Sequence, residues 1–192
     1  MTKIRGFEIV KEYQNKDIKL PQRSTTNSAG YDFFAPEDIR IDTCLWEGKF
    51  SLECANKPVL ISTGIKAYML PDEFLGLYNR SSNTKNLGLI LASGVNVIDS
   101  DYYNNIENEG HIFFMFWNFS KKTVYFKKGD KIGQGVFMKY LLDDKDILQQ
   151  PKIGYESLIE FNAQLNTIPK TTFVGNPIEQ QIRQGGFGST GS

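Results

Sequence analysis

The chain has 192 residues, and its 22 basic and 22 acidic side chains give a formal net charge of zero. This balance argues against nonspecific binding to nucleic acid, because a basic excess supplies most of that affinity. The most apolar stretch, residues 112–117, is far too short to cross a bilayer, and the charged first residues lack the apolar run of a secretory signal. We therefore expect one cytoplasmic domain with an appendage and with no nucleic-acid or membrane partner.

Histidine and cysteine are scarce, which restricts the chemistry. His111 is the single histidine, so zinc sites that need two or three imidazoles are excluded. Cys44 and Cys54 lack C-x-x-C spacing and are expected to be free or buried thiols, although a Cys–His nucleophile pair is formally open. The candidate chemistry therefore rests on carboxylates, arginines, hydroxyls, amides and glycine backbone.

Alternation of apolar and polar residues dominates the first 140 positions and predicts strands. The expected strands cover residues 57–63, 65–70, 74–78, 111–119, 123–126 and 131–140, with turn signals at 71–73 and 127–130. Helical periodicity occurs only in a short piece after Ser82 and over residues 155–165. The pattern predicts an all-β sandwich or barrel with one or two short helices.

Four segments within this pattern could carry chemistry, and each also has an ordinary structural explanation. Asp32, in residues 29–35, could simply be solvated, and the serines of residues 79–85 could be helix N-caps. With Arg80, those serines could instead bind a phosphate. Asp99 and Asp101 lie two residues apart on a predicted strand and could be solvated, hold Mg²⁺ through water or provide a general base. The fourth segment, residues 132–135, carries an amide donor.

The end of the chain changes character. Residues 141–182 mix polar residues and proline with scattered apolar ones, and the last nine residues, QGGFGSTGS, are mostly glycine and hydroxyl residues. Such a tail is most often a frayed end. Phe187 does not fit that interpretation, because a purely flexible tail needs no aromatic ring.

In their order and spacing these segments resemble the five motifs of the trimeric dUTPase family, the deoxyuridine triphosphate nucleotidohydrolases, which include phage-encoded members. The matching stretches are AGYDFFA at 29–35, NRSSNTK at 79–85, GVNVIDSDYY at 94–103, KIGQG at 131–135 and RQGGFGSTG at 183–191. The resemblance implies a β-clip or jelly-roll barrel that forms a homotrimer. Residues 1–140 would be the core with motifs one to four, residues 141–182 an inserted segment with a short helix, and residues 183–192 a flexible arm.

The resemblance also implies the reaction, hydrolysis of dUTP to dUMP and pyrophosphate by attack of water on the α-phosphorus. Asp99 would deprotonate the water, and Gln134 would donate to the α-phosphate. Mg²⁺ would be held mainly by the triphosphate, with Asp32 supporting its water shell. Tyr102 would pack on the deoxyribose and leave no room for a 2′-hydroxyl.

The remaining residues implied by the resemblance bind substrate. Arg80, Ser81 and Ser82 would bind phosphates. The backbone of a tight hairpin would hold the uracil, through Gly94, Asn96, Val97 and Ile98. The arm would close as a lid over the site and supply Arg183, Phe187, Ser189 and Thr190, with the phenylalanine ring stacked on the base.

Some features depart from the family pattern and leave alternatives open. Asn96 stands where glycine is usual, the link between motifs four and five is long, and residues 44–56 look like an enlarged loop. One alternative is a nucleotide-gated regulatory protein that binds a partner through residues 141–182; another is surface elaboration without a partner. A dCTP deaminase of the same fold would need a glutamate beside an arginine at the hairpin, where the chain has I-D-S-D-Y.

Overall fold

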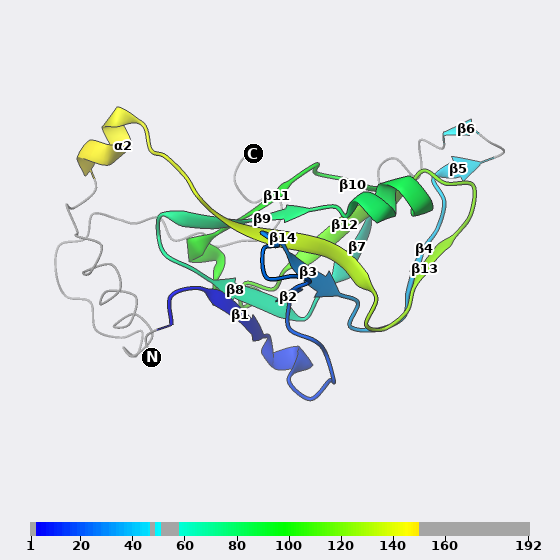
Figure 1. Ribbon diagram of the computed structural model, residues 1–192, viewed down its shortest axis with the longest axis horizontal. Coiled ribbons are helices and arrows are strands. Elements are labelled where there is room, and N and C mark those ends of the chain that lie inside the picture. The colour runs from blue at the N-terminus through cyan, green and yellow to red at the C-terminus, as the bar shows by residue number, and fades with distance from the viewer. Residues whose placement is uncertain (1–2, 47–48, 51–57, 150–192) are drawn as a thin grey trace.

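The structure, a computed structural model, describes residues 3–46, 49–50 and 58–149, which form short antiparallel strands with a few helical turns (Figure 1). The strands are β1 (Gly6–Ile9), β2 (Gln22–Arg23), β3 (Tyr31–Phe34), β4 (Ile39–Ile41), β5 (Leu45–Trp46), β6 (Lys49–Phe50), β7 (Val59–Ser62), β8 (Ile65–Tyr68), β9 (Glu73–Tyr78), β10 (Leu89–Leu91), β11 (Asn96–Asp99), β12 (Phe113–Asn118), β13 (Val124–Phe126) and β14 (Lys131–Lys139). The helical elements are the 3₁₀ turns η1 (Lys11–Tyr13) and η3 (Ser100–Tyr102), the π-helical turn η2 (Asn83–Leu87) and the α-helix α2 (Asp144–Gln149).

Two sheets enclose the core. The larger has the strand order β11-β9-β14-β3-β2 and the smaller the order β10-β12-β7, while β1-β8, β13-β4 and β5-β6 form separate pairs. Alternating residues of the central strands point inward, and Leu75, Leu77 and Ile132 are completely buried. Phe33 of the large sheet meets Phe114 of the small sheet edge to face, with ring centroids 5.4 Å apart. The large sheet is thereby fixed against the small one.

The predicted all-β architecture is confirmed, and the expected strands between residues 57 and 140 form with ends that differ by at most two residues. β1 was not predicted, because its half-buried side chains give no clear alternation. The expected helical piece after Ser82 is a single π-helical turn, and α2 was missed. The enlarged loop at 44–56 contains the β5-β6 pair, and the helix expected over 155–165 lies outside the described residues.

Two smaller expectations can also be compared with the structure. Cys44 is a buried free thiol, as expected, whereas Cys54 lies outside the described residues. Within the described part of the chain, no helix is long and apolar enough to cross a membrane.

Gly133 lets the two sheets approach each other closely. A Cβ atom built at Gly133 would lie 2.1 Å from Cε1 of Phe114, whose ring is completely buried. The pairing of β14 with β3 also shifts register between Lys131 and Gly133. The absence of a side chain therefore lets the phenylalanine ring pack directly on the β14 backbone.

Gly133→Ala should destabilise the protein by about 1–3 kcal/mol, the usual cost of overpacking a core. The expected result is a lower melting temperature in calorimetry. Adding Phe114→Leu, which shortens the obstructing side chain, should recover part of the loss. A Gly133→Ala variant as stable as the original chain would show that the ring moves aside freely.

Candidate active site

Three neighbouring strands bring together Asp32, Arg80, Lys131 and Gln134, which we call the basic cluster. Gln134 of β14 lies opposite Asp32 of β3 on one side and Tyr78 of β9 on the other. Arg80 is the second residue after the end of β9. The sheet register therefore assembles residues from three motifs that are far apart in the sequence.

The cations of this cluster converge on Asp32. Lys131 Nζ lies 2.7 Å from Asp32 Oδ2, and Arg80 Nε lies 3.6 Å from Asp32 Oδ1. Burial alone would raise the pKa of Asp32, but hydrogen bonds from Lys131 and Ser24, with the charges of Lys131 and Arg80, outweigh it and lower that pKa. Arg80 Nη1 also donates to the carbonyl of Lys131, at 3.1 Å. The guanidinium is thus oriented while 30% of its side chain stays exposed.

Two asparagines hold the segment that carries Arg80. Asn83 is 1% exposed, and its amide donates to Ile132 O at 2.8 Å and to Asn79 Oδ1 at 3.0 Å. Asn79 Oδ1 also accepts from the Arg80 amide, at 2.9 Å. Ser82 makes no side-chain capping hydrogen bond, so the N-cap interpretation is wrong for it. Ser81 is exposed beside Arg80, which leaves its hydroxyl accessible to a ligand.

Gln134 is held in place by close neighbours. Its Nε2 donates to the carbonyl of Asn79 at 3.3 Å. A Cβ atom at Gly30 would lie 2.5 Å from Gln134 Oε1, so glycine is required there for the amide to occupy this position. Residues 29–35 therefore contribute both the Asp32 carboxylate and, at Gly30, the space that the Gln134 amide occupies.

Sequence reasoning missed several members of this region. No signal in the sequence assigned a contact with the site to Lys131, Ser24, Asn79 or Asn83. Lys131 precedes Gln134 by three residues, and it reaches Asp32 because the β14 register shifts between Lys131 and Gly133. That irregularity has no signature in the sequence.

Asp99 ends β11 and lies opposite Phe74, at the start of β9. The expected hairpin over residues 94–98 differs from the structure, because β10 and β11 belong to different sheets and are joined by a turn in which Gly94 donates to Leu91 O at 3.0 Å. Gly94 has φ of 71°, which favours glycine. Val97 and Asp99 point to one face of β11, and Asn96 and Ile98 point to the buried face.

Asn96 is 5% exposed, and neither its Oδ1 nor its Nδ2 has a hydrogen-bond partner among the described residues. Tyr102, in η3, is 4% exposed; its hydroxyl donates to His111 O at 3.2 Å and accepts from Asn108 Nδ2 at 2.8 Å. Both side chains are thus enclosed by the described part of the chain.

The predicted catalytic residues form two groups on one face of the large sheet, one at Asp99 and the other at Asp32 and Gln134. Asp99 lies opposite Phe74, and Gln134 lies opposite Tyr78, four residues further along β9. At about 3.3 Å per residue, about 13 Å of strand separates the two groups. The structure therefore brings Asp32, Arg80 and Gln134 together but keeps Asp99 and Tyr102 apart from them. Arg183, Phe187, Ser189 and Thr190 lie outside the described residues.

Metal-binding capacity is limited in this region. In the part of the chain that the structure describes, no group of three or more His, Cys, Asp or Glu side chains could hold a metal ion. Asp32 already pairs with two cations, although a carboxylate accepts up to about four hydrogen bonds and retains capacity for a metal-bound water. The residues present fit a metal that arrives with its ligand rather than a resident ion.

Comparisons with known proteins show what the chain as a whole is similar to. The family model for dUTPase matches residues 16–152. A deoxyuridine 5′-triphosphate nucleotidohydrolase of Lactococcus lactis is 40% identical over 190 residues, covering 99% of both chains, and one of Haemophilus ducreyi is 32% identical, covering 72% of this chain and 81% of its own. The crystal structure of dUTPase from Streptococcus mutans is 42% identical with a TM-score of 0.62, covering 72% of this chain and 98% of that chain. A dUTPase from Staphylococcus aureus phage phi11, at 16% identity and TM-score 0.57 (80% and 99% coverage), shares the fold.

Asp32→Asn should remove the anion on which Lys131 and Arg80 converge and lower the free energy of unfolding at pH 7 by about 1.5–3 kcal/mol, the range for hydrogen bonds to charged groups. Because the folded pKa of Asp32 lies below its unfolded value of about 4, its stabilisation is complete above that value and is lost as the pH falls through the folded pKa. Urea unfolding from pH 7 to pH 3 should show the difference shrinking. Asp17→Asn, at a fully exposed carboxylate, is the control, and a pH-independent difference would contradict the assignment.

Proposed function

The chain belongs to the dUTPase family and is a dUTP diphosphatase, and we propose that its active site is shared between the subunits of a homotrimer. In this arrangement the basic cluster of one subunit binds the phosphates, and Asp99 of a neighbouring subunit activates the water. The single observation that carries the proposal is the separation along β9, because Asp99 and Gln134 are both assigned to the α-phosphate.

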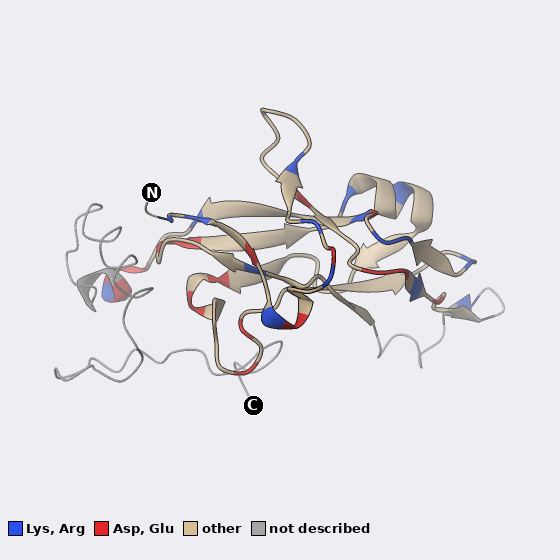
Figure 2. Ribbon diagram, turned by 90° about the horizontal axis from the view of Figure 1, so that it is seen from below, with Lys and Arg blue, Asp and Glu red and all other residues tan. Residues whose placement is uncertain are grey.

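The charges at the two ends of β9 support this pairing. Around the Asp99 end, burial raises the pKa of Tyr140, and the nearby charges of Asp99, Asp72 and Asp101 raise it further. The other end carries Arg80 and Lys131. Figure 2 shows acidic and basic residues interspersed over the described ribbon. Charge complementarity between subunits would therefore come from local groups of residues and not from a wholly acidic or wholly basic face. Lys139 pairs with Asp72 at the acidic end. Asp32 pairs with Lys131 and Arg80 at the basic end, so each end carries both signs with an excess of one. Ends of opposite excess suit head-to-tail contacts, which close a ring of three when the rotation between subunits is a third of a turn.

An apolar sheet face offers area for the subunit contact. On the outer face of the β10-β12-β7 sheet, Leu60 is 50% exposed and Ile90 is 43% exposed. Beside Ile90 lies Trp117, whose Nε1 is buried without a hydrogen-bond partner among the described residues. A second copy of the chain would cover the aliphatic side chains and could supply an acceptor for the indole. We place part of the trimer contact there.

The chemistry follows from charge placement. Asp99 accepts a proton from the attacking water, which requires a carboxylate within hydrogen-bond reach of that water. Gln134 donates to the α-phosphate, and Arg80 with Ser81 and Ser82 binds the phosphates that leave. The substrate is the Mg²⁺ complex of dUTP: the cation neutralises triphosphate charge, and Asp32 has acceptor capacity for a water on it.

Specificity for base and sugar is assigned to the half of the site that carries Asp99, which we call the acidic half. The backbone of Gly94, Asn96, Val97 and Ile98 holds uracil, and the Tyr102 ring excludes a 2′-hydroxyl. Arg183, Phe187, Ser189 and Thr190 of the arm close over the bound nucleotide, and closure excludes bulk solvent while the attacking water stays in the site.

Neither alternative function is favoured by a specific structural observation. The curated relatives are dUTP nucleotidohydrolases, which sets the dCTP deaminase interpretation aside. A regulatory partner for residues 141–182 stays a prediction, because most of that segment lies outside the described residues. The cytoplasmic location is likewise a prediction from the sequence.

Asp99→Asn should lower kcat for pyrophosphate release from Mg²⁺–dUTP by at least about a thousandfold, because the amide cannot take the proton. Calorimetric titration with dUTP should give a Kd within a fewfold of the original. Asp101→Asn, at the exposed carboxylate two residues on, is the matched control and should stay active. Parallel assays with dCTP, dTTP and UTP test the specificity, and an active Asp99→Asn enzyme would remove Asp99 from the mechanism.

Mixing two inactive variants tests the shared site. Arg80→Ala disables the basic half and Asp99→Asn the acidic half, so each homotrimer should be inactive. In trimers randomly assembled from equal amounts, about one quarter of the sites would combine two intact halves, if each site joins the two halves across one contact of a symmetric ring. Activity should therefore return to about a quarter of the original. If mixed trimers are shown to form and stay inactive, both halves of each site must come from one subunit.

A further inference from the structure

The loop after Tyr102, residues 103–110, is tightly folded on itself. Asn104 and Glu109 have φ of 56° and 60°, unusual values for residues with side chains, and Asn104 N donates to Glu109 O at 3.0 Å. Gly110 has φ of 80°, and a Cβ there would lie 2.5 Å from the carbonyl oxygen of Tyr102. The loop therefore has a closed neck that packs against the backbone of Tyr102.

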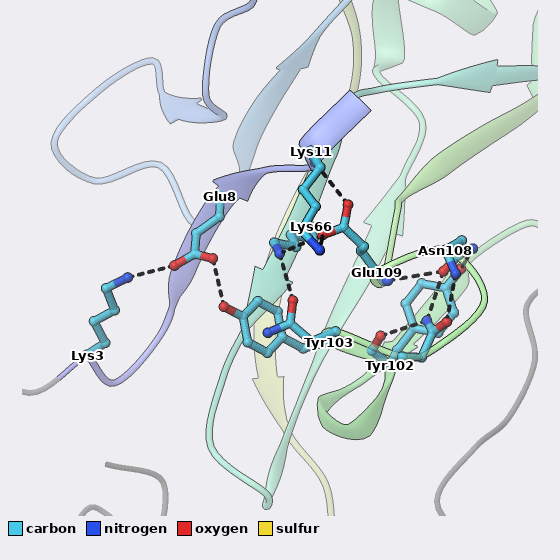
Figure 3. Close-up of polar contacts among 11 residues, drawn as sticks. Lys3, Glu8, Lys11, Lys66, Tyr102, Tyr103, Asn108 and Glu109 are labelled. Atoms are coloured by element: carbon cyan, nitrogen blue, oxygen red, sulfur yellow. Dashed lines mark hydrogen bonds and ion pairs between the residues drawn. The ribbon is translucent and has the colours of Figure 1, made fainter. Parts of the chain in front are cut away.

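Asn108 connects this loop to the Tyr102 side chain (Figure 3). Its Nδ2 donates to the Tyr102 hydroxyl at 2.8 Å, while its Oδ1 accepts from the Gly110 amide at 3.0 Å and from Asn105 Nδ2 at 2.8 Å. Asn105 Nδ2 also donates to the Tyr102 carbonyl at 2.9 Å. The phenol is thus bonded on two sides, by Asn108 and by the His111 carbonyl.

A buried lysine anchors the neck of the loop from strand β8. Lys66 is 8% exposed, and its Nζ donates to Asn104 Oδ1 at 2.6 Å and lies 3.6 Å from Glu109 Oε1. Glu109 Oε2 also accepts from the Lys11 amide at 2.9 Å. Figure 3 shows Lys66 beside Glu109 at one side of the loop and Asn108 with Tyr102 at the other. The anchored neck restricts where Asn108 can hold the phenol.

We propose that Asn108 is a positioning residue for sugar selection, acting through the ring of Tyr102. The inference rests on the proposed role of Tyr102 against the deoxyribose. An aromatic ring excludes one extra oxygen only if it cannot shift by about 1 Å, and a phenol bonded at its tip is restrained in that way. The hydrogen bonds of the loop asparagines therefore hold the Tyr102 ring where it excludes the 2′-hydroxyl of UTP and accepts dUTP.

The test measures kcat/KM for dUTP and for UTP in Asn108→Ala, Tyr102→Phe and the double variant. Each single change should lower the dUTP-to-UTP ratio about five- to tenfold, which corresponds to one net hydrogen bond. The double variant should fall no further than the worse single variant, because both changes remove the same restraint. Tyr102→Phe keeps the ring and the fold, so the test stands even if Asn108→Ala folds poorly.

Ile106→Ala is the control, since Ile106 is 86% exposed within the same loop and should leave the ratio unchanged. A ratio within twofold of the original in Tyr102→Phe and a correctly folded Asn108→Ala would overturn the proposal, as would additive effects in the double variant. Tyr102→Ala tests the role of the Tyr102 ring separately from the role of Asn108. If it lowers the ratio while Tyr102→Phe and Asn108→Ala do not, only the role of Asn108 fails; if it leaves the ratio intact, the proposed role of Tyr102 fails too.

Discussion

The rest of the structure depends on the register in which β9 pairs with its two neighbours. Pairing with β14 places Gln134 opposite Tyr78, and pairing with β11 places Asp99 opposite Phe74. Sheet register is strongly specified where one face is buried, because a slip of one residue would expose Leu75 and Leu77 to solvent. The hydrophobic core therefore sets the separation between the two halves of the site.

The all-β architecture and most of the central strands could be predicted, because alternation and turn residues are local signals. The roles assigned to Asp32, Arg80 and Gln134 required the family resemblance, and the structure brings these three together. Their contacts could not be predicted, since Lys131 reaches Asp32 only through a register shift and Gly30 matters only for the space it leaves. The enclosure of Tyr102 also depends on a loop whose asparagines are, in the sequence, ordinary polar residues.

Asparagine recurs where the backbone leaves regular structure. Asn83 ties the π-helical turn to β14, Asn105 and Asn108 tie a loop to Tyr102, and buried Asn118 donates to Ile41 O at 2.9 Å and Lys122 O at 2.8 Å. An amide both donates and accepts, so one side chain satisfies several backbone groups that no strand pairs. Such a network orients side chains without placing additional charge near an anionic substrate.

The separation of the two halves along β9 also links catalysis to assembly. In the proposed arrangement a lone subunit holds every catalytic group of the described core and yet has no complete site, because its Asp99 serves a neighbour. Specific activity would then depend on protein concentration and would fall steeply on dilution below the range in which trimers persist. A newly made chain would stay inert until it contacted another copy, so the rate of synthesis and the local concentration of the protein would control the onset of dUTP hydrolysis as directly as the chemistry itself.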